Sequence, residues 1–191
     1  MKRKHIVLTI GIVLLSVVII IGGWYLFVIS GAVFSLMPNP PKPEITYGEF
    51  PISITVDING EEKVVEDTVI CEFDGVENLG SGGKRRKWKI YMKSTGERMV
   101  TLYDLRTSNE FTEWGTQVLE LCFDPGNAEY FMGDIGDSQR EGSLGKWIDY
   151  LYSTPEGETG YSAFDLDEAW EKYKIKIISW KISPPIQNSF K

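Results

Sequence analysis

Histidine is almost absent from this chain of 191 residues, since the single example is His5. Residues 6–191 therefore contain no imidazole, the side chain that most often carries a proton in catalysis near neutral pH. This absence excludes a Ser-His-Asp or Cys-His hydrolase and the usual histidine-containing zinc sites from that part of the chain. Any catalysis there would have to use other groups.

Cysteine is also scarce, with only Cys71 and Cys122. Two thiolates cannot complete a four-cysteine zinc site, and no cysteine near the N-terminus is present for a lipid anchor. Two alternatives remain: a disulfide, which would close a loop of about 50 residues and add about 2–4 kcal/mol, or two buried free thiols. Strand alternation puts Cys71 on the same face of its strand as Val69, whereas Cys122 points to the other face of its strand from Leu121. A disulfide between them therefore requires a particular arrangement of the sheet.

Charge is missing altogether from residues 6–28, which form an unbroken apolar run. A helix needs about 20 apolar residues to cross a hydrocarbon core of about 30 Å, so this run is long enough to span a membrane. Lys2, Arg3 and Lys4 precede it, and the positive-inside rule keeps them in the cytoplasm. We therefore predict a single-pass signal-anchor with the C-terminal part of the chain outside the cytoplasm.

A cleaved signal peptide is the alternative interpretation of the same run. Ser30, Gly31 and Ala32 offer the small residues that a signal peptidase requires. The apolar core of a signal peptide is usually about 7–15 residues long, which favours the uncleaved anchor. Both interpretations export the rest of the chain.

The remaining chain divides into a spacer and one domain. Residues 1–5 form the cytoplasmic start and 6–28 the anchor, while 29–44 form a proline-rich linker, in which proline favours extended backbone. Residues 45–191 form an extracytoplasmic domain of ordinary size for one core. All 27 acidic residues and 17 of the 20 basic ones follow the anchor, a net charge of −10, which makes the domain a poor binder of nucleic acid.

Alternation of apolar and polar residues predicts that this domain is mainly antiparallel β-sheet. The clearest strand is 50–58, and Asn59-Gly60 suits a tight turn that returns 63–73 as its hairpin partner. Further predicted strands are 84–94, 97–103 paired with it, 117–123, 128–132 after the turn 124–127, and 175–182. Residues 133–145 read as a long surface loop, and 147–152 fit helix or strand equally.

One helix is predicted near the C-terminus, over residues 166–173. Asp165 is suited to cap it, and Glu168 stands three residues later, as in a capping box. The fold class is therefore α+β, a mainly antiparallel β-sheet domain with one or two short helices, preceded by one N-terminal transmembrane helix.

One basic cluster stands out in the acidic domain. It alternates with aromatic residues along a predicted strand and comprises Lys84, Arg85, Arg86, Lys87, Lys89 and Lys93. Such a cluster suits an anionic partner, for example a wall polymer, lipid headgroups or an acidic protein. The alternative, which we favour, is a solvated strand face whose lysines prevent edge-to-edge pairing. The glycines before it match neither the phosphate-loop nor the dinucleotide fingerprint, so no cofactor is predicted.

Carboxylates are the remaining candidates for catalysis. They form three clusters: Glu66 with Asp67; Asp134, Asp137 and Glu141; and Asp165, Asp167 and Glu168. A glycosidase needs two such groups about 5–9 Å apart, whereas solvated loops and helix caps need only their polarity. A group of aromatic residues suits either a sugar-stacking platform or the core: Trp147, Tyr150, Tyr152, Tyr161, Trp170 and Trp180.

Residues 44–75, the segment KRRKWK (84–89) and the ending AWEKYKIKIISWKIS (169–183) resemble stretches in uncharacterised, membrane-anchored proteins of Gram-positive bacteria. The resemblance implies the same topology and no particular activity. We therefore expect a membrane-anchored module that binds an envelope polymer or a membrane protein. The alternatives are a carboxylate-dependent envelope enzyme such as a glycan hydrolase, and structural or regulatory attachment to a membrane complex.

Overall fold

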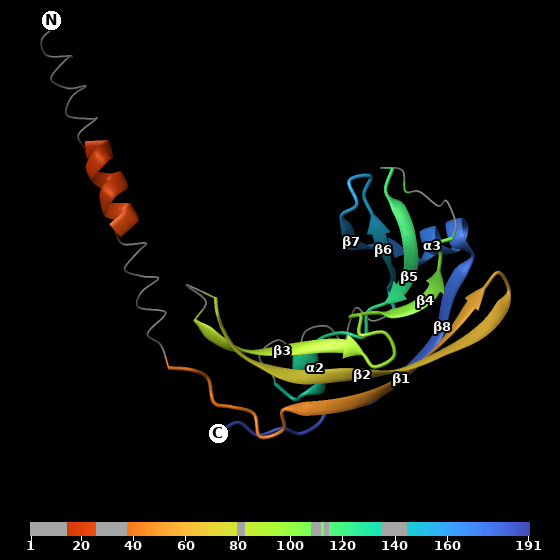
Figure 1. The fold of residues 1–191 in the computed structure, drawn as a ribbon, viewed down its shortest axis with the longest axis horizontal. Helices are drawn as coiled ribbons and strands as arrows, with labels where there is room; N and C mark the ends of the chain where they lie inside the picture. Colours follow the sequence, from red (N-terminus) through yellow and green to blue (C-terminus); the bar gives the residue numbers. More distant parts are fainter. Residues whose placement is uncertain (1–14, 26–37, 80–82, 108–111, 113–114, 135–144) are drawn as a thin grey trace, which may run out of the picture. The chain divides into compact units, whose positions relative to one another are not determined.

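The computed structural model describes residues 15–25, 38–79, 83–107, 112, 115–134 and 145–191. The chain divides into two compact units, one formed by residues 1–42 with 75–87 and the other by 43–74 with 88–191. His5, Ser30–Ala32, Asp137 and Glu141 lie outside the described residues. The predicted α+β class with mostly antiparallel sheet is confirmed (Figure 1).

The first sheet has four strands in the order β3-β2-β1-β8. Its strands are β1 (Tyr47–Ile58), β2 (Glu61–Asn78), β3 (Lys84–Met92) and β8 (Ile175–Ile182). The predicted hairpin is confirmed, because Ile58 pairs with Glu61 across a two-residue turn in which Asn59 and Gly60 both have positive φ. That turn fixes the register of β1 against β2 from Ile58 opposite Glu61 to Tyr47 opposite Glu72.

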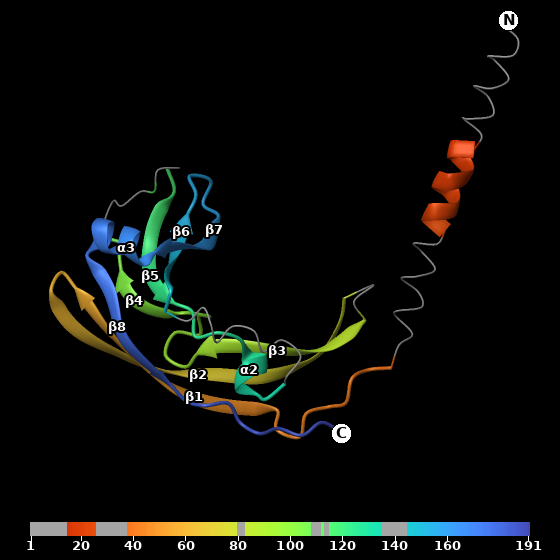
Figure 2. The same ribbon diagram turned by 180° about the vertical axis from the view of Figure 1, so that it is seen from behind.

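The second sheet has the order β4-β5-β6-β7, with all neighbours antiparallel. Its strands are β4 (Val100–Asp104), β5 (Gln117–Phe123), β6 (Trp147–Ser153) and β7 (Thr159–Asp165). Within the second unit it packs over the concave side of the first sheet (Figures 1 and 2). The predicted pairing of residues 97–103 with the preceding strand is wrong: β4 leaves the first sheet because Val100 and Leu102 are buried in the core between the sheets.

Residues 128–132, predicted as a strand, instead begin with the short helix α2 (Ala128–Phe131). Ala128 and Phe131 are three residues apart and both are buried, which is helical spacing. Phe131 packs on Phe50 of β1 with ring centroids 4.8 Å apart. The helical turn therefore places both Ala128 and Phe131 in the core.

The predicted C-terminal helix is confirmed as α3 (Leu166–Tyr173). Asp165 caps it by accepting a hydrogen bond of 2.8 Å from the backbone N–H of Glu168. The helix ends at Lys174 in the left-handed conformation, from which the chain enters β8. A bulge at Thr55/Val56 shifts the β1–β8 register, so Ile178 lies opposite no residue of β1.

The hydrophobic core lies between the two sheets. Inward side chains of β1, including Ile52, Ile54 and Val56, are almost fully buried there, together with Leu121 of β5 and Ile148 of β6. Each is an alternate residue of its strand, so the opposite face of β1 carries Pro51, Ser53, Thr55 and Asp57.

In the first unit, residues 15–25 are helical (red to orange in Figure 1) and their side chains are exposed. These are the described part of the predicted anchor, because residues 6–14 and 26–28 lie outside the described set. No helix in the described part of the chain is long and apolar enough to cross a membrane.

Candidate functional site

A groove of about 680 Å³ lies on the first sheet, where β2, β1 and β8 run side by side. Ser53 of β1 is directly opposite Glu66 of β2 and also directly opposite Lys181 of β8. Cross-strand partners share a face, so these three side chains form one row, which we call the charged row. It lies on the face away from the core, because its neighbours Ile52 and Ile54 point inward.

A second row runs beside the charged row in the same groove. Pro51 is directly opposite Thr68 of β2, and on the β8 side Ser183 hydrogen-bonds the Pro51 carbonyl through its N–H at 3.1 Å and its hydroxyl at 3.2 Å. The lining is completed by Ile52, Asp67, Ile182 and Pro184. Its volume falls within the range of small-molecule sites, about 300–1,000 Å³.

The charged row places one carboxylate, Glu66, and one ammonium, Lys181, in the groove. Among the described residues, neither the Glu66 carboxylate nor the Lys181 ammonium has a hydrogen bond or an ion pair. They flank Ser53 from opposite sides, two strand spacings apart, or about 10 Å. The groove therefore presents a negative and a positive group to an occupant at opposite ends of one row.

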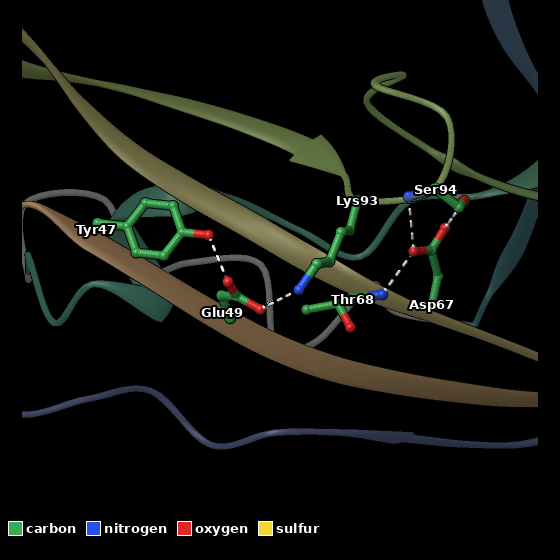
Figure 3. Close-up of polar contacts among 6 residues, drawn as sticks. All are labelled: Tyr47, Glu49, Asp67, Thr68, Lys93 and Ser94. Atoms are coloured by element: carbon green, nitrogen blue, oxygen red, sulfur yellow. Dashed lines mark hydrogen bonds and ion pairs between the residues drawn. The ribbon is translucent and has the colours of Figure 1, made fainter.

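Asp67, by contrast, is committed to the fold. Its Oδ1 accepts hydrogen bonds from the backbone N–H groups of Thr68 at 2.7 Å and Ser94 at 3.2 Å, and its Oδ2 accepts one from the Ser94 hydroxyl at 2.5 Å (Figure 3). These bonds fasten β2 to the turn that follows β3. Asp67 therefore supports the edge of the groove, and of the predicted Glu66/Asp67 pair only Glu66 is open to a ligand.

A second polar network includes Tyr47 and Glu49 of β1, which by strand alternation share the outer face with Ser53 (Figure 3). Glu49 of β1 accepts hydrogen bonds from the Tyr47 hydroxyl at 2.6 Å and from the Lys93 ammonium at 2.7 Å. The pKa of Glu49 is lowered, mainly by the hydrogen bond from Lys93 and to a smaller extent by the hydrogen bond from Tyr47. In turn, the hydrogen bond to Glu49 raises the pKa of Tyr47 to about 12.

The predicted basic cluster is divided among separate partners in each unit. In the second unit, Lys93 pairs with Glu49 and Lys89 with Asp74, at 2.7 and 3.0 Å. In the first unit, Arg85 pairs with Glu77. There too, Lys84 donates to the side chain of Asn39 at 3.1 Å and Arg86 to the carbonyl of Pro41 at 3.3 Å, while Lys87 also has an interaction partner. Much of the positive charge is thus balanced within the protein.

The two cysteines are free and buried in the structure, so the disulfide alternative is not realised. Cys71 of β2 faces the core, whereas Cys122 of β5 is paired with Thr101 and Asp149 on the outer side of the other sheet. Their side chains therefore belong to different sheets and different faces. Burial raises the pKa of each thiol to about 12.

The remaining predicted acids that the structure describes have structural partners or lie at a helix end. Asp134 is buried in the second unit and accepts a hydrogen bond from the Trp88 indole. Asp165 caps α3, while Asp167 and Glu168 stand in its first turn. Within the described ranges, no group of three or more His, Cys, Asp and Glu side chains is placed to hold a metal ion.

The predicted aromatic platform does not form as one surface. Along β6, Trp147 alternates with Tyr150 and Tyr152, so they point to opposite faces of the second sheet. Tyr150 stacks on Phe164 with ring centroids 4.1 Å apart. The other members lie on β7, α3 and β8.

Sequence reasoning missed the groove and the placement of Lys181 beside Ser53. The alternation of residues 50–58 indicated that Ser53 points outward, and the Asn59-Gly60 turn indicated that it faces Glu66. The position of Lys181 had no such local signal, because β8 pairs with a strand more than 100 residues earlier.

Comparison of the chain with protein-family models, with curated proteins and with solved structures gave no match.

Proposed function

We propose that this protein is a single-pass, membrane-anchored binding module that displays its β-sheet domain outside the cytoplasm at a bacterial cell envelope. The groove of the first sheet is its binding surface. The observation that carries this proposal is the pair of opposite charges at Glu66 and Lys181, which line the groove on either side of Ser53 and have no side-chain partner among the described residues. Uncompensated charges in a groove favour an external ligand that supplies the missing partners.

The anchor in this proposal is supported by the uncharged run of residues 6–28 and the basic residues before it. Single cysteines introduced as Lys2→Cys and Gln187→Cys test the topology in intact cells with a membrane-impermeant maleimide. We expect labelling at position 187 and none at position 2, because the impermeant maleimide does not reach the cytoplasm. The two native thiols are buried and should add no background labelling. Labelling at position 2 alone would contradict the proposed orientation.

Binding through the groove is tested by site-specific photo-crosslinking in the native membrane. A photoreactive phenylalanine analogue replaces Ser53 in the charged row, and a matched variant carries it at Glu62, an exposed position of β2 outside the groove. We expect a discrete cross-linked product from position 53 and none from position 62. No product from position 53, or the same product from both positions, contradicts the proposed binding surface.

The geometry favours binding over a carboxylate-dependent glycan hydrolase. Such an enzyme needs two carboxyl groups that both face the substrate. In this groove both oxygens of Asp67 accept hydrogen bonds from Thr68 or Ser94, which leaves Glu66 as the one available acid of the pair.

A further inference from the structure

The charged row has the form of a binding site for a small zwitterion. Glu66 and Lys181 stand on either side of Ser53, on the same face of the sheet. A ligand that carries only negative charge is attracted by Lys181 but repelled by Glu66. A cation is attracted by Glu66 but repelled by Lys181. A molecule with one positive and one negative end satisfies both groups at once.

The spacing of the row sets the length of that molecule. Two strand spacings separate Glu66 from Lys181 by about 10 Å. An extended peptide advances about 3.3–3.6 Å per residue, so about three residues carry its terminal ammonium and carboxylate to the two ends of the row.

The rest of the groove fits a peptide backbone. Ser53 and Thr68 present hydroxyl groups, which both donate and accept hydrogen bonds, as peptide N–H and C=O groups require. Pro51 and Pro184 add apolar rings for contact with small side chains.

We propose that the groove binds a short peptide of about three residues with free ends, its ammonium at Glu66 and its carboxylate at Lys181. This inference rests on the proposed function and names the class of ligand for the same site. Recognition of the two ends leaves the side chains between them largely unspecified.

The probe is trialanine, titrated into the full chain in a mild detergent by isothermal calorimetry. Three analogues accompany it: one acetylated at the amino end, one amidated at the carboxyl end, and one with both changes. We expect each single cap to weaken binding about five- to tenfold, since each removes one charge-assisted contact. Equal affinity for free and doubly capped trialanine would overturn the proposal.

The variants Glu66→Gln and Lys181→Met assign each end of the peptide. Glu66→Gln should abolish the effect of acetylation and keep that of amidation, while Lys181→Met should do the opposite. The matched controls are Glu62→Gln and Lys176→Met, because these residues flank Asp57 on the same face in the same way but lie outside the groove. Equal losses in the control variants would contradict the assignment.

Exchanging the charges separates this recognition from general damage to the fold. Glu66→Lys and Lys181→Glu should each abolish binding, whereas the double variant should restore it, because the peptide binds turned end for end. Failure of the double variant to recover while it remains folded by circular dichroism counts against the proposal. If trialanine does not bind but the photoreactive analogue at position 53 still forms its cross-linked product, the peptide inference fails and the proposed function stands.

Discussion

The indole Nε1 of Trp88 donates a hydrogen bond of 2.9 Å to Oδ2 of Asp134 inside the second unit. Both residues are almost fully buried. The bond joins β3 to the segment that follows α2, and it satisfies a buried indole donor. It gives the sheet a polar attachment within an otherwise apolar core.

Trp88→Phe should therefore lower the free energy of unfolding by about 1–3 kcal/mol, because the Asp134 carboxylate loses a buried donor. Chemical denaturation followed by circular dichroism measures the change. The matched control is Trp170→Phe on α3, where the side chain is 40% exposed, and its effect should stay below about 1 kcal/mol. Equal effects of the two substitutions would show that the hydrogen bond contributes nothing.

Lys93→Met should raise the pKa of Glu49 toward its usual value of 4.5, because it removes the largest cause of the lowered pKa. Since the folded pKa lies below the usual value, the stabilisation from Glu49 is fully present above about pH 4.5 and is lost as the pH falls through the folded pKa. Carboxyl NMR titration measures the shift. Lys89→Met, which breaks the pair with Asp74 instead, should leave the Glu49 titration unchanged.

The two thiols should resist labelling in the native protein and react fully once it is unfolded without reductant. Burial and pKa values of about 12 keep both in the unreactive protonated form at neutral pH. Labelling with a chromogenic disulfide reagent, before and after addition of concentrated guanidinium, gives the count. A denatured protein that shows no thiol until it is reduced would establish the disulfide instead.

Gly133→Ala should lower stability and loosen the C-terminal segment. Gly133 has φ of +64°, and a Cβ there would lie 2.5 Å from the carbonyl oxygen of Ile186. The left-handed conformation alone costs an alanine about 1–2 kcal/mol, and the contact adds to that cost. Gly96→Ala is the matched control, because Gly96 also has positive φ but no atom within 4 Å of such a Cβ.

Hydrogen exchange locates the effect of this substitution. Exchange at the Ile186 N–H, which donates to the carbonyl of Phe131 at 2.9 Å, should accelerate in Gly133→Ala and stay unchanged in Gly96→Ala. Equal stability of the two variants would mean that the Ile186 contact is without consequence.

The elements that were predictable from sequence are those with local signals. The hairpin of β1 and β2 follows from strict alternation and from Asn59-Gly60, and α3 follows from its capping residue Asp165. Residues 128–132 were misassigned because a run of five residues fits either period, and only the burial of Ala128 and Phe131 decides for a helix. β7 gave no signal, since its edge sequence TGYSAFD buries one apolar side chain, Phe164.

What could not be predicted depends on contacts between distant residues. Nothing near Val100 indicates that β4 joins the second sheet, because sequential strands usually pair with each other and the preference is broken here by burial between the sheets. The charged row likewise needs the pairing of β1 with β8 and its bulge at Thr55/Val56. Half of this site was therefore accessible from sequence, namely Ser53 opposite Glu66.

The C-terminal segment returns to the point where the second unit begins. Pro43 forms a bridge with Phe190, the N–H of Glu44 donates to the carbonyl of Ser189 at 2.8 Å, and the Asn188 side chain hydrogen-bonds both backbone groups of Ile45. Residues 43–45 and 188–190 thus lie side by side. A circular permutant that joins these two segments and opens the chain elsewhere on the surface should therefore keep the groove in place.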